Sequence, residues 1–307
     1  MSIYASLAPQ GPSGFGYGST AEDVTEGLSL KGQTVLVTGC NSGIGWETAR
    51  VLALRGARVV GTARTVAKAQ EACARVTGVT LPLACELSEP GSVRACIQAV
   101  KAAGIELDAV ICNAGVMALA KLELVHGYER QFFTNHIGHF MLVTGLLGQL
   151  KEAARVVMLS SSAHRQAPKK GIELDNLDGA KHYAPWSAYG QSKLANLLFA
   201  KQLARRFAGS RRTANAVHPG VIRTNLQRHM SPLLSVALTL SGPLFLKDVA
   251  QGAATETYVA THPGLAGVSG QYFADSNIAS ARADADDGEL AARLWETSER
   301  IVAELPG

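Results

Sequence analysis

The sequence predicts an α/β fold in which one doubly wound parallel sheet carries helices on both faces. Short apolar runs alternate with longer helical segments between residues 33 and 273. A continuous apolar run such as 34–38 is typical of a strand covered on both faces, as strands of parallel sheets are. Strands alternating with helices of this length indicate crossover connections, and no internal repeat or linker divides the chain.

The predicted elements follow one another in regular alternation. The strand at 34–38 leads into a helix over 44–55, and Gly56 supplies a typical helix stop. Further strands are expected at 58–63, 79–85, 107–113, 155–160, 213–218 and 270–273. Further helices are expected at 66–76, 90–103, 128–150, 188–207 and 250–261. Residues 1–28 are rich in glycine and show no period, which predicts an irregular extension before a single domain over 29–307.

The composition excludes several classes of protein. Of the 307 residues, 47% are hydrophobic, which is too many for a disordered or fibrous chain. The 29 Lys and Arg residues against 25 Asp and Glu leave a net charge of +4, and basic doublets are scattered, so no nucleic-acid partner is implied. The uncharged stretches 136–150 and 230–246 fall short of the roughly 20 residues that a spanning helix needs. We therefore expect no membrane span.

Cysteine and histidine spacing argues against metal and disulfide frameworks. The five cysteines occur without any C-x-x-C pair, at positions Cys40, Cys73, Cys85, Cys96 and Cys112. Together with the lack of a secretory leader pattern, this predicts a reduced, cytoplasmic location. His136 and His139 are three residues apart but have no evident carboxylate or thiol partner, so no metal site is expected.

Residues 38–45 form a glycine-rich turn, T-G-C-N-S-G-I-G, between the first strand and the first helix. Gly39 permits a tight turn, Gly43 lets a pyrophosphate approach the backbone, and Gly45 allows the helix to pack closely on the strand. The helix N-terminus adds unpaired N–H groups and a positive dipole end. The candidate phosphate contacts are Gly39, Asn41, Ser42, Gly43, Ile44 and Gly45. The alternative is an ordinary strand-to-helix turn, since the spacing is not G-x-G-x-x-G.

Five motifs in order resemble the short-chain dehydrogenase/reductase family, over residues 28 to 273. They are T-G-x-x-x-G-x-G at 38–45, N-A-G at 113–115, Asn at 135, Y-x-x-x-K at 189–193 and P-G at 219–220. The resemblance implies a Rossmann-type fold and a nicotinamide dinucleotide cofactor. It implies further cofactor contacts at Leu87, Asn113, Ala114, Gly115, Tyr189, Lys193, Pro219, Gly220, Val221 and Thr224.

The end of the second strand predicts a preference for NADP(H) over NAD(H). In the family, a carboxylate at this position binds the ribose hydroxyls of NAD, and here Ala63 followed by Arg64 replaces it. A guanidinium can grip a 2′-phosphate, although Arg64 at a strand end could also lie solvated. No basic residue occupies 40–42, so the strictness of the preference stays open. Glu86 falls where relatives have Asp beside the adenine, or is a solvated loop carboxylate.

The catalytic prediction rests on an acidified phenol. A tyrosine with its ordinary pKa of about 10 must be made roughly 2–3 units more acidic to be substantially ionised near pH 7–8. Tyr189 and Lys193 are four residues apart, hence on one helix face, where the ammonium can do this. The resemblance adds Ser161 as hydrogen-bond donor to the substrate oxygen, in preference to Ser160 and Ser162. It also adds Asn135, which kinks its helix and anchors a water near Lys193.

Within the family the chain is most similar to the retinol dehydrogenase and WW-domain oxidoreductase branch, with light-dependent protochlorophyllide reductases more distant. Segments 189–200, 218–224, 245–247 and 268–273 carry this resemblance. It implies interconversion of a lipophilic or aromatic alcohol and its ketone or aldehyde. It also implies that a homo-oligomer could form through the helices carrying Asn135 and Tyr189.

Three alternatives are left open by the sequence. The Leu- and Met-rich segment after the P-G motif predicts a substrate lid around 225–250, but it could equally be a surface helix packed on the core. Residues 233–246 could instead contact a membrane surface. The chain could also be a dinucleotide-binding scaffold or sensor without turnover, which the complete set of four predicted catalytic residues argues against.

Overall fold

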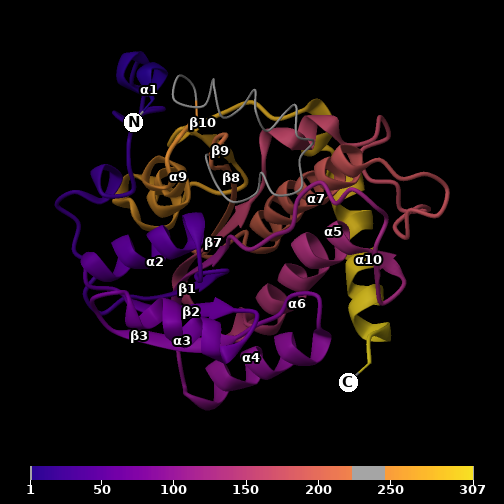
Figure 1. Ribbon diagram of the computed structural model, residues 1–307, viewed down its shortest axis with the longest axis horizontal. Helices are drawn as coiled ribbons and strands as arrows, with labels where there is room; N and C mark the ends of the chain where they lie inside the picture. The colour runs from indigo at the N-terminus through magenta and orange to yellow at the C-terminus, as the bar shows by residue number, and fades with distance from the viewer. Residues whose placement is uncertain (1, 223–245, 307) are drawn as a thin grey trace.

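The computed structural model describes residues 2–222 and 246–306, and an eight-stranded sheet runs through its centre (Figure 1). The strand order is β10-β9-β8-β7-β4-β1-β2-β3, and every neighbouring pair is parallel except β10 with β9. The strands are β1 Thr34–Thr38, β2 Arg58–Ala63, β3 Thr80–Ala84, β4 Leu107–Cys112, β7 Leu150–Leu159, β8 Thr213–His218, β9 Tyr272–Ala274 and β10 Asn277–Ile278. The predicted α/β class with a parallel sheet is therefore confirmed.

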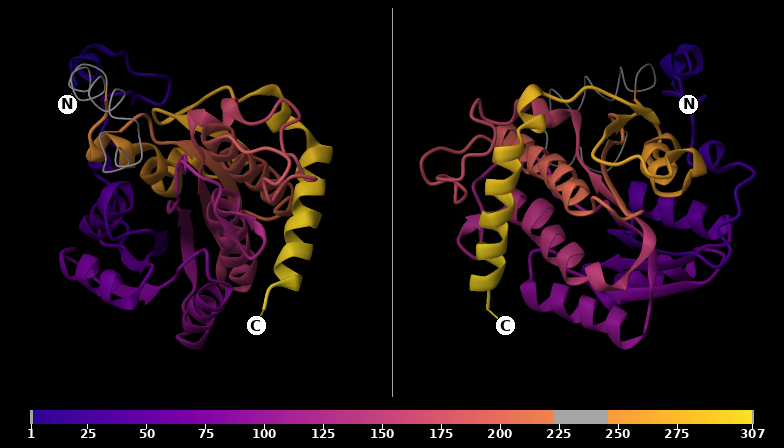
Figure 2. Two further views of the ribbon diagram at one scale, coloured as in Figure 1. Left: turned by 45° about the vertical axis from the view of Figure 1, so that its right-hand side comes forward. Right: turned by 180° about the vertical axis from the view of Figure 1, so that it is seen from behind.

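Helices cover both faces of this sheet (Figure 2). The helices are α1 Ile3–Leu7, α2 Gly43–Leu54, α3 Val66–Ala74, α4 Pro90–Ala102, α5 Arg130–Phe132, α6 Gly138–Gly145, α7 Pro185–Arg206, α9 Val249–Thr261 and α10 Gly288–Glu304. One apolar cluster joins α4, α6, α7 and α10 to the sheet, and a second joins α2, α3 and α9. On β1, Leu36 belongs to the first cluster while Val35 and Val37 belong to the second, as alternation along a strand requires.

The strand order reverses between β1 and β4. At such a point of a doubly wound sheet, the connections that follow the two neighbouring strands run to opposite faces of the sheet. Ligands bind in the crevice that this leaves outside the carboxyl ends of the strands. The glycine-rich turn follows β1, and the N-A-G motif follows β4. The topology thus brings the two motifs together.

The predicted helix over 128–150 is wrong at both ends. A hairpin of β5 Leu124–Val125 and β6 Tyr128–Glu129 occupies its start, with Gly127 at φ +83° in the turn. A π-helical turn, Phe133–Ile137, then interrupts the helix, and β7 already begins at Leu150. Residues 136–150 carry no charged side chain, so their hydrophobic pattern could not fix where the helix ends.

The C-terminal helix α10 was not predicted. Asp287 caps its N-terminus by accepting hydrogen bonds from the Glu289 and Leu290 N–H groups. Its Trp295 packs against Phe140 of α6 and Phe199 of α7, with ring centroids 4.9 and 5.5 Å away. In Figure 2, α10 lies in yellow along the outer side of these helices.

Residues before β1 lie against the last part of the domain. The Ala21 N–H donates to the Ala250 carbonyl, and the Phe15 ring packs edge-on against Tyr258 of α9 at 5.5 Å. The Ser13 N–H donates to the Asn277 side chain of β10. Across the described residues, no helix combines the length and apolar character needed to traverse a bilayer.

Candidate functional site

The glycine-rich turn is braced against the end of β4. Gly39 has φ +71°, and a Cβ at Gly45 would lie 2.3 Å from Asn113 Nδ2 and 2.5 Å from the Gly39 carbonyl oxygen. Asn113 Nδ2 donates to the Thr38 carbonyl oxygen at 2.8 Å, and the Ala114 N–H donates to the Thr38 hydroxyl at 3.0 Å. Side chains larger than hydrogen at 39 and 45 would break this contact.

The first turn of α2 can receive an anion. Ser42 is its N-cap residue, but the Ser42 side chain makes no capping hydrogen bond. Gly43 has φ +56°, and no atom lies within 4 Å of the position that a Cβ would take there. The first N–H groups of a helix have no intrahelical partners and lie at its positive end. The residues at this turn therefore fit a pyrophosphate group.

Arg64 and Glu86 lie at the carboxyl ends of the neighbouring strands β2 and β3. The Arg64 side chain is 65% exposed, and its Nε lies 4.0 Å from Glu86 Oε2. The other Glu86 oxygen accepts hydrogen bonds from the Ser88 N–H and hydroxyl. Leu87 is buried and packs against Gly138 of α6, where a Cβ would lie 2.3 Å from the Leu87 carbonyl oxygen. The guanidinium is accessible, but a carboxylate competes for it.

Tyr189, Lys193 and Ser161 come together at the carboxyl end of β7. The Ser161 hydroxyl accepts a hydrogen bond from the Ala163 N–H at 3.2 Å, and the Ser161 side chain favours the ionised form of the Tyr189 phenol by lowering its pKa. The Lys193 Nζ lies 5.7 Å from the centroid of the Tyr189 ring and donates to the Leu159 carbonyl oxygen at 2.9 Å. Ser160 instead donates to the Lys193 carbonyl oxygen at 2.8 Å, and the Ser162 N–H bonds to His218. Of the three serines, Ser161 is the one whose side chain acts on the pKa of the phenol.

Burial dominates the electrostatics of this group. It raises the pKa of Tyr189 to about 12, and the Ser161 side chain opposes the rise. It lowers the pKa of Lys193 to about 8, while the Glu256 carboxylate favours the ammonium form. Both side chains are buried, so desolvation disfavours both charged forms, and acidification of the phenol by Lys193 stays a prediction.

Asn135 lies in the π-helical turn, as the predicted kink requires. Its Oδ1 accepts from the Val116 N–H at 2.8 Å, and its Nδ2 donates to the Val116 carbonyl and to the Ser192 hydroxyl, both at 2.9 Å. A Cβ at Gly115 would lie 3.0 Å from Asn135 Oδ1 and 3.5 Å from Lys193 Nζ. The side-chain amide thus holds the chain that follows the N-A-G motif close to Lys193.

The P-G motif is supported by a buried lysine that sequence analysis did not single out as a functional residue. Gly220 has φ +93°, and a Cβ there would lie 2.6 Å from Lys247 Cδ. The Lys247 N–H donates to the Val221 carbonyl, and its Nζ contacts Asp275 at 2.6 Å and the Tyr17 ring at 4.7 Å. Thr224 and most of the predicted lid, 223–245, lie outside the described residues.

Glu256 is a second buried residue that the sequence analysis missed. It lies on α9, fully buried, and its Oε1 accepts from the Thr48 hydroxyl of α2 at 2.5 Å. Burial raises its pKa to about 8, opposed by Thr48 and by Lys193. The available signal was that Glu256 is the single charged residue in the run 250–260.

The two histidines near Asn135 have separate partners. His139 shares hydrogen bonds with the Thr38 hydroxyl and the Asn135 carbonyl, both at 2.9 Å, whereas His136 bonds to Ser298 of α10. Burial lowers the pKa of His136 to about 3 and that of His139 to about 4. Within 2–222 and 246–306, no three His, Cys, Asp or Glu side chains group as metal ligands would.

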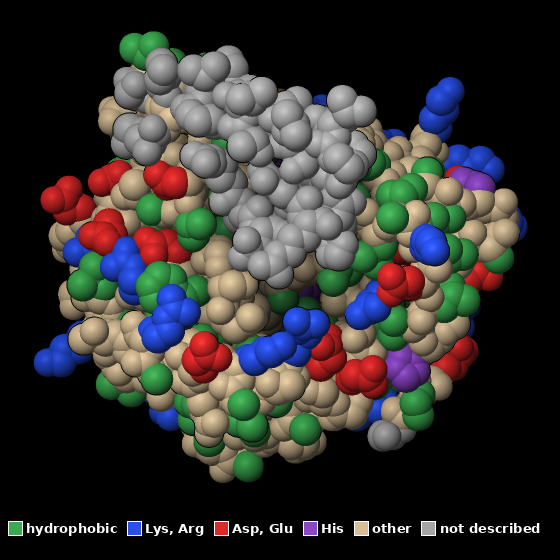
Figure 3. Space-filling view, viewed as in Figure 1, with side chains coloured by type: hydrophobic (Ala, Val, Ile, Leu, Met, Phe, Trp, Pro, Cys, Tyr) green, Lys and Arg blue, Asp and Glu red, His purple; other side chains and the backbone are tan. Residues whose placement is uncertain are grey.

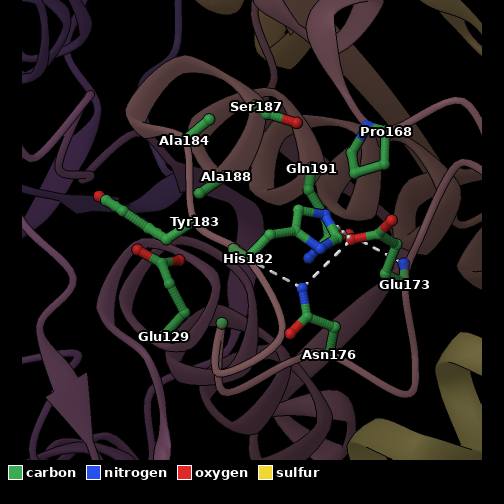
Figure 4. Close-up of a pocket in the computed structure, with 11 residues that line it drawn as sticks. Glu129, Pro168, Glu173, Asn176, His182, Tyr183, Ala184, Ser187, Ala188 and Gln191 are labelled. Atoms are coloured by element: carbon green, nitrogen blue, oxygen red, sulfur yellow. Dashed lines mark hydrogen bonds and ion pairs between the residues drawn. The ribbon is translucent and has the colours of Figure 1, made fainter.

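A small cavity lies where the segment before α7 folds back on that helix (Figure 4). The Glu173 N–H donates to Gln191 Oε1 at 2.8 Å, and His182 Nε2 lies 3.0 Å from Glu173 Oε2. The cavity volume of ≈ 20 Å³ holds about one water molecule. This cavity is too small for the predicted substrate. On the face drawn in Figure 3, basic and acidic side chains are interspersed rather than gathered into a field of one sign.

Comparisons with known proteins agree with this geometry. The family model described as short chain dehydrogenase matches residues 33–233. The chain is 42% identical over 325 aligned positions, covering all of both proteins, to "Short-chain dehydrogenase TIC 32 B, chloroplastic" of Brassica napus. It is 38% identical over 298 positions to retinol dehydrogenase 14 of Homo sapiens, covering 90% of this chain and 88% of that protein. The crystal structure of an uncharacterized protein from Mycobacterium paratuberculosis superposes with a TM-score of 0.74 at 33% identity, covering 92% of this chain and 98% of that one.

Proposed function

Because the chain belongs to the short-chain dehydrogenase family and is therefore an oxidoreductase acting on CH–OH groups with NAD(P), we propose that it interconverts a lipophilic or aromatic alcohol and its ketone or aldehyde, using NADP(H) in preference to NAD(H). The observation that carries the proposal is the grouping at one place of the Tyr189 phenol, the Ser161 side chain that lowers its pKa, and Lys193, whose Nζ lies 5.7 Å from the Tyr189 ring centroid. A scaffold without turnover would not need this arrangement.

The residues at the glycine-rich turn fit the cofactor. The uncapped first turn of α2 and the open space at Gly43 would hold the pyrophosphate. Arg64, exposed and not preceded by an acid, would hold the 2′-phosphate of NADP(H), and Lys193 the nicotinamide ribose. The remainder of the dinucleotide would be lined by Leu87, Asn113–Gly115, Pro219–Val221 and Thr224. When bound, the nicotinamide supplies or accepts the hydride.

The proposed proton chemistry favours reduction. With a pKa of about 12, Tyr189 is a neutral phenol at pH 7 and can donate its proton to a carbonyl oxygen. Ser161 would donate a second hydrogen bond to that oxygen. Lys193, with a pKa of about 8, is mostly an ammonium at pH 7, which favours the phenolate that the donation leaves behind. Asn135 holds the backbone next to Lys193.

An aromatic residue supports the proposed substrate class. Trp186, at the start of α7, is 38% exposed and stands edge-on to the Tyr189 ring at 6.1 Å. An exposed indole beside the proposed proton donor suits a flat or lipophilic substrate better than a sugar or an acid. A lid around 225–250 stays a prediction.

Location and assembly are also proposals. Five free cysteines support a cytoplasmic location, although the Brassica relative is named as chloroplastic. A homo-oligomer formed through α6 and α7 would have to accommodate α10, which packs against these helices.

The test is turnover of a panel of ketones, aldehydes and bulky secondary alcohols by wild type and Tyr189→Phe. We expect the variant to bind NADPH normally and to lose nearly all turnover. Tyr128→Phe, which changes a tyrosine at the β5–β6 hairpin, is the matched control and should retain activity. Retained activity in Tyr189→Phe would refute the proton donor. A wild type that binds NADPH but turns over no member of the panel would favour the scaffold alternative.

A further inference from the structure

Two thiols from distant parts of the chain share one small space over β2. Cys40 lies within the glycine-rich turn, and Cys73 lies on α3. A Cβ placed on Gly61 of β2 would lie 2.9 Å from the sulfur of each. Each thiol shifts the pKa of the other, upward for Cys40 and downward for Cys73. Gly61 thus leaves room for both sulfurs in one space, and a disulfide would form once they approach to the bonding distance of about 2.05 Å.

We propose that Cys40 and Cys73 form a redox-sensitive dithiol site, which hydrogen peroxide converts to a disulfide that weakens dinucleotide binding at the glycine-rich turn. The site itself needs no assumption about activity, whereas its effect on the dinucleotide rests on the function proposed above. Neither thiol takes part in the proposed catalytic arrangement.

Cys73 is the thiol that reacts first. Its neighbours Cys40, Thr80 and Gly61 favour its thiolate and lower its pKa, whereas Cys73 and burial raise the pKa of Cys40. The thiolate, not the thiol, is the nucleophile. Cys73 is also 6% exposed against 2% for Cys40, so a small oxidant reaches it more readily.

The chemistry balances with hydrogen peroxide as the oxidant. The Cys73 thiolate attacks one peroxide oxygen, the O–O bond breaks, and a sulfenic acid and hydroxide form. The Cys40 sulfur then attacks the sulfenic sulfur, its proton is taken by the departing hydroxide, and water leaves. Two thiols lose two electrons, and one peroxide is reduced to two waters.

The position of Cys40 explains the expected effect on binding. Its N–H donates to the Thr62 carbonyl at 2.9 Å, and its neighbours Asn41 to Gly43 provide the proposed phosphate contacts. Bringing two sulfurs from non-bonded contact to bond length draws the turn towards α3. Loss of one hydrogen bond to a charged phosphate weakens binding by about tenfold or more.

Three other cysteines provide internal controls. Cys85 and Cys96 also share a thiol contact, and Cys112 is buried near Cys85. These thiols lie beyond β3 and at the end of β4, outside the glycine-rich turn. A disulfide between Cys85 and Cys96 would leave the turn unconstrained.

The experiment treats the full chain with hydrogen peroxide, with and without later dithiothreitol. Peptide mapping under non-reducing conditions identifies the linked cysteines, and NADPH and NADH fluorescence titrations give the dissociation constants. Cys73→Ser removes the reactive thiol without changing the turn, and Cys96→Ser is the matched control. In wild type and Cys96→Ser we expect a linkage between residues 40 and 73, an approximately tenfold higher dissociation constant, and recovery of both by dithiothreitol. Cys73→Ser should keep its affinity.

Several results would overturn the proposal. One is that residues 40 and 73 stay unlinked in wild type treated with peroxide, or that only residues 85 and 96 become linked. Another is that Cys73→Ser loses as much affinity for the dinucleotide as wild type does after the same treatment. A linkage between 40 and 73 with unchanged affinity would refute the effect on binding. If the untreated chain bound neither NADPH nor NADH, the proposed function would fail, while the peptide map would still decide the dithiol site.

Discussion

Lys193 and Glu256 form an electrostatic pair in the interior, and each moves the pKa of the other towards its charged form. Burial works against both, so that the ammonium and the carboxyl each have a pKa of about 8. Neither residue is more than 3% exposed. The proposed proton donor therefore lies beside a lysine whose charge depends on a carboxyl on another helix.

Glu256→Gln should flatten the dependence of stability on pH. The Glu256 pKa is raised in the folded state, so its contribution to stability is full below pH 4.5 and is lost as pH rises through 8. At about 1.4 kcal/mol per tenfold change in the equilibrium, the loss amounts to several kcal/mol. Lys193, with a lowered pKa, changes stability chiefly between pH 8 and 10.5.

Urea denaturation at pH 5 and pH 8 measures this effect. Wild type should lose stability between the two values, and Glu256→Gln should lose much less. Glu71→Gln, an exposed change on α3, should behave like wild type. Parallel pH dependences for wild type and Glu256→Gln would mean that Glu256 does not titrate in this range.

The same substitution should move the pH profile of the reaction. Without the carboxylate, the ammonium form of Lys193 is less favoured, so its pKa falls further. If the ammonium is required, the alkaline limb of kcat/KM moves to lower pH, and activity at pH 8 falls several-fold while activity at pH 6 is kept. If the alkaline limb of kcat/KM lies at the same pH in Glu256→Gln as in wild type, Glu256 does not influence the proton relay.

Replacing neighbouring serines should have different effects. Ser161→Ala removes the hydroxyl that lowers the pKa of Tyr189 and that is proposed to bond the substrate oxygen, and we expect kcat to fall by about 100-fold with normal NADPH binding. Ser160→Ala removes a buried hydrogen bond to the Lys193 carbonyl and should cost about 1 kcal/mol of stability with turnover changed by only a few-fold. Steady-state kinetics and thermal unfolding distinguish them. An equal fall in kcat for Ser161→Ala and Ser160→Ala would refute the proposed role of the Ser161 hydroxyl.

Arg64→Ala should weaken NADPH more than NADH. Loss of a charge-assisted grip on the 2′-phosphate predicts an increase in KM for NADPH of about tenfold or more, with little change for NADH. Arg58→Ala, an exposed arginine at the other end of β2, is the control. Wild type that uses both cofactors with equal kcat/KM would refute the preference. The carboxylate of Glu86, 4.0 Å from Arg64, limits how strong the preference becomes.

The sequence predicted those parts of the fold whose signal is local. β1 is largely apolar, and the structure places β1, β2 and β8 at the predicted residues. The C-terminal end of the helix at 128–150 was wrong because the uncharged run 136–150 gives no periodic contrast. The residues at positions 39–45, 113–115, 135, 161, 189 and 193 lie together, but sequence could not reveal their electrostatics. The raised pKa of Tyr189 follows from burial, which depends on the whole fold.

Lys247 and Glu256 show why the remainder of the site was missed. A buried charge is recognisable only through its partner, and Asp275 lies 28 residues after Lys247 while Thr48 lies 208 residues before Glu256. Helix α10 differs, since its apolar positions 290, 294, 295 and 301 follow a helical period. That signal was present in the sequence but lies beyond the residues that resemble the family.

The contacts of the first residues with α9 and β10 also constrain how the chain is made. Ser13 and its partner Asn277 are 264 positions apart, and Gly18 and Gln251 are 233 apart. A ribosome therefore releases the amino end long before its binding surface exists. The amino-terminal residues therefore stay unbound until the last strands have been synthesised, and their docking is a late step in folding.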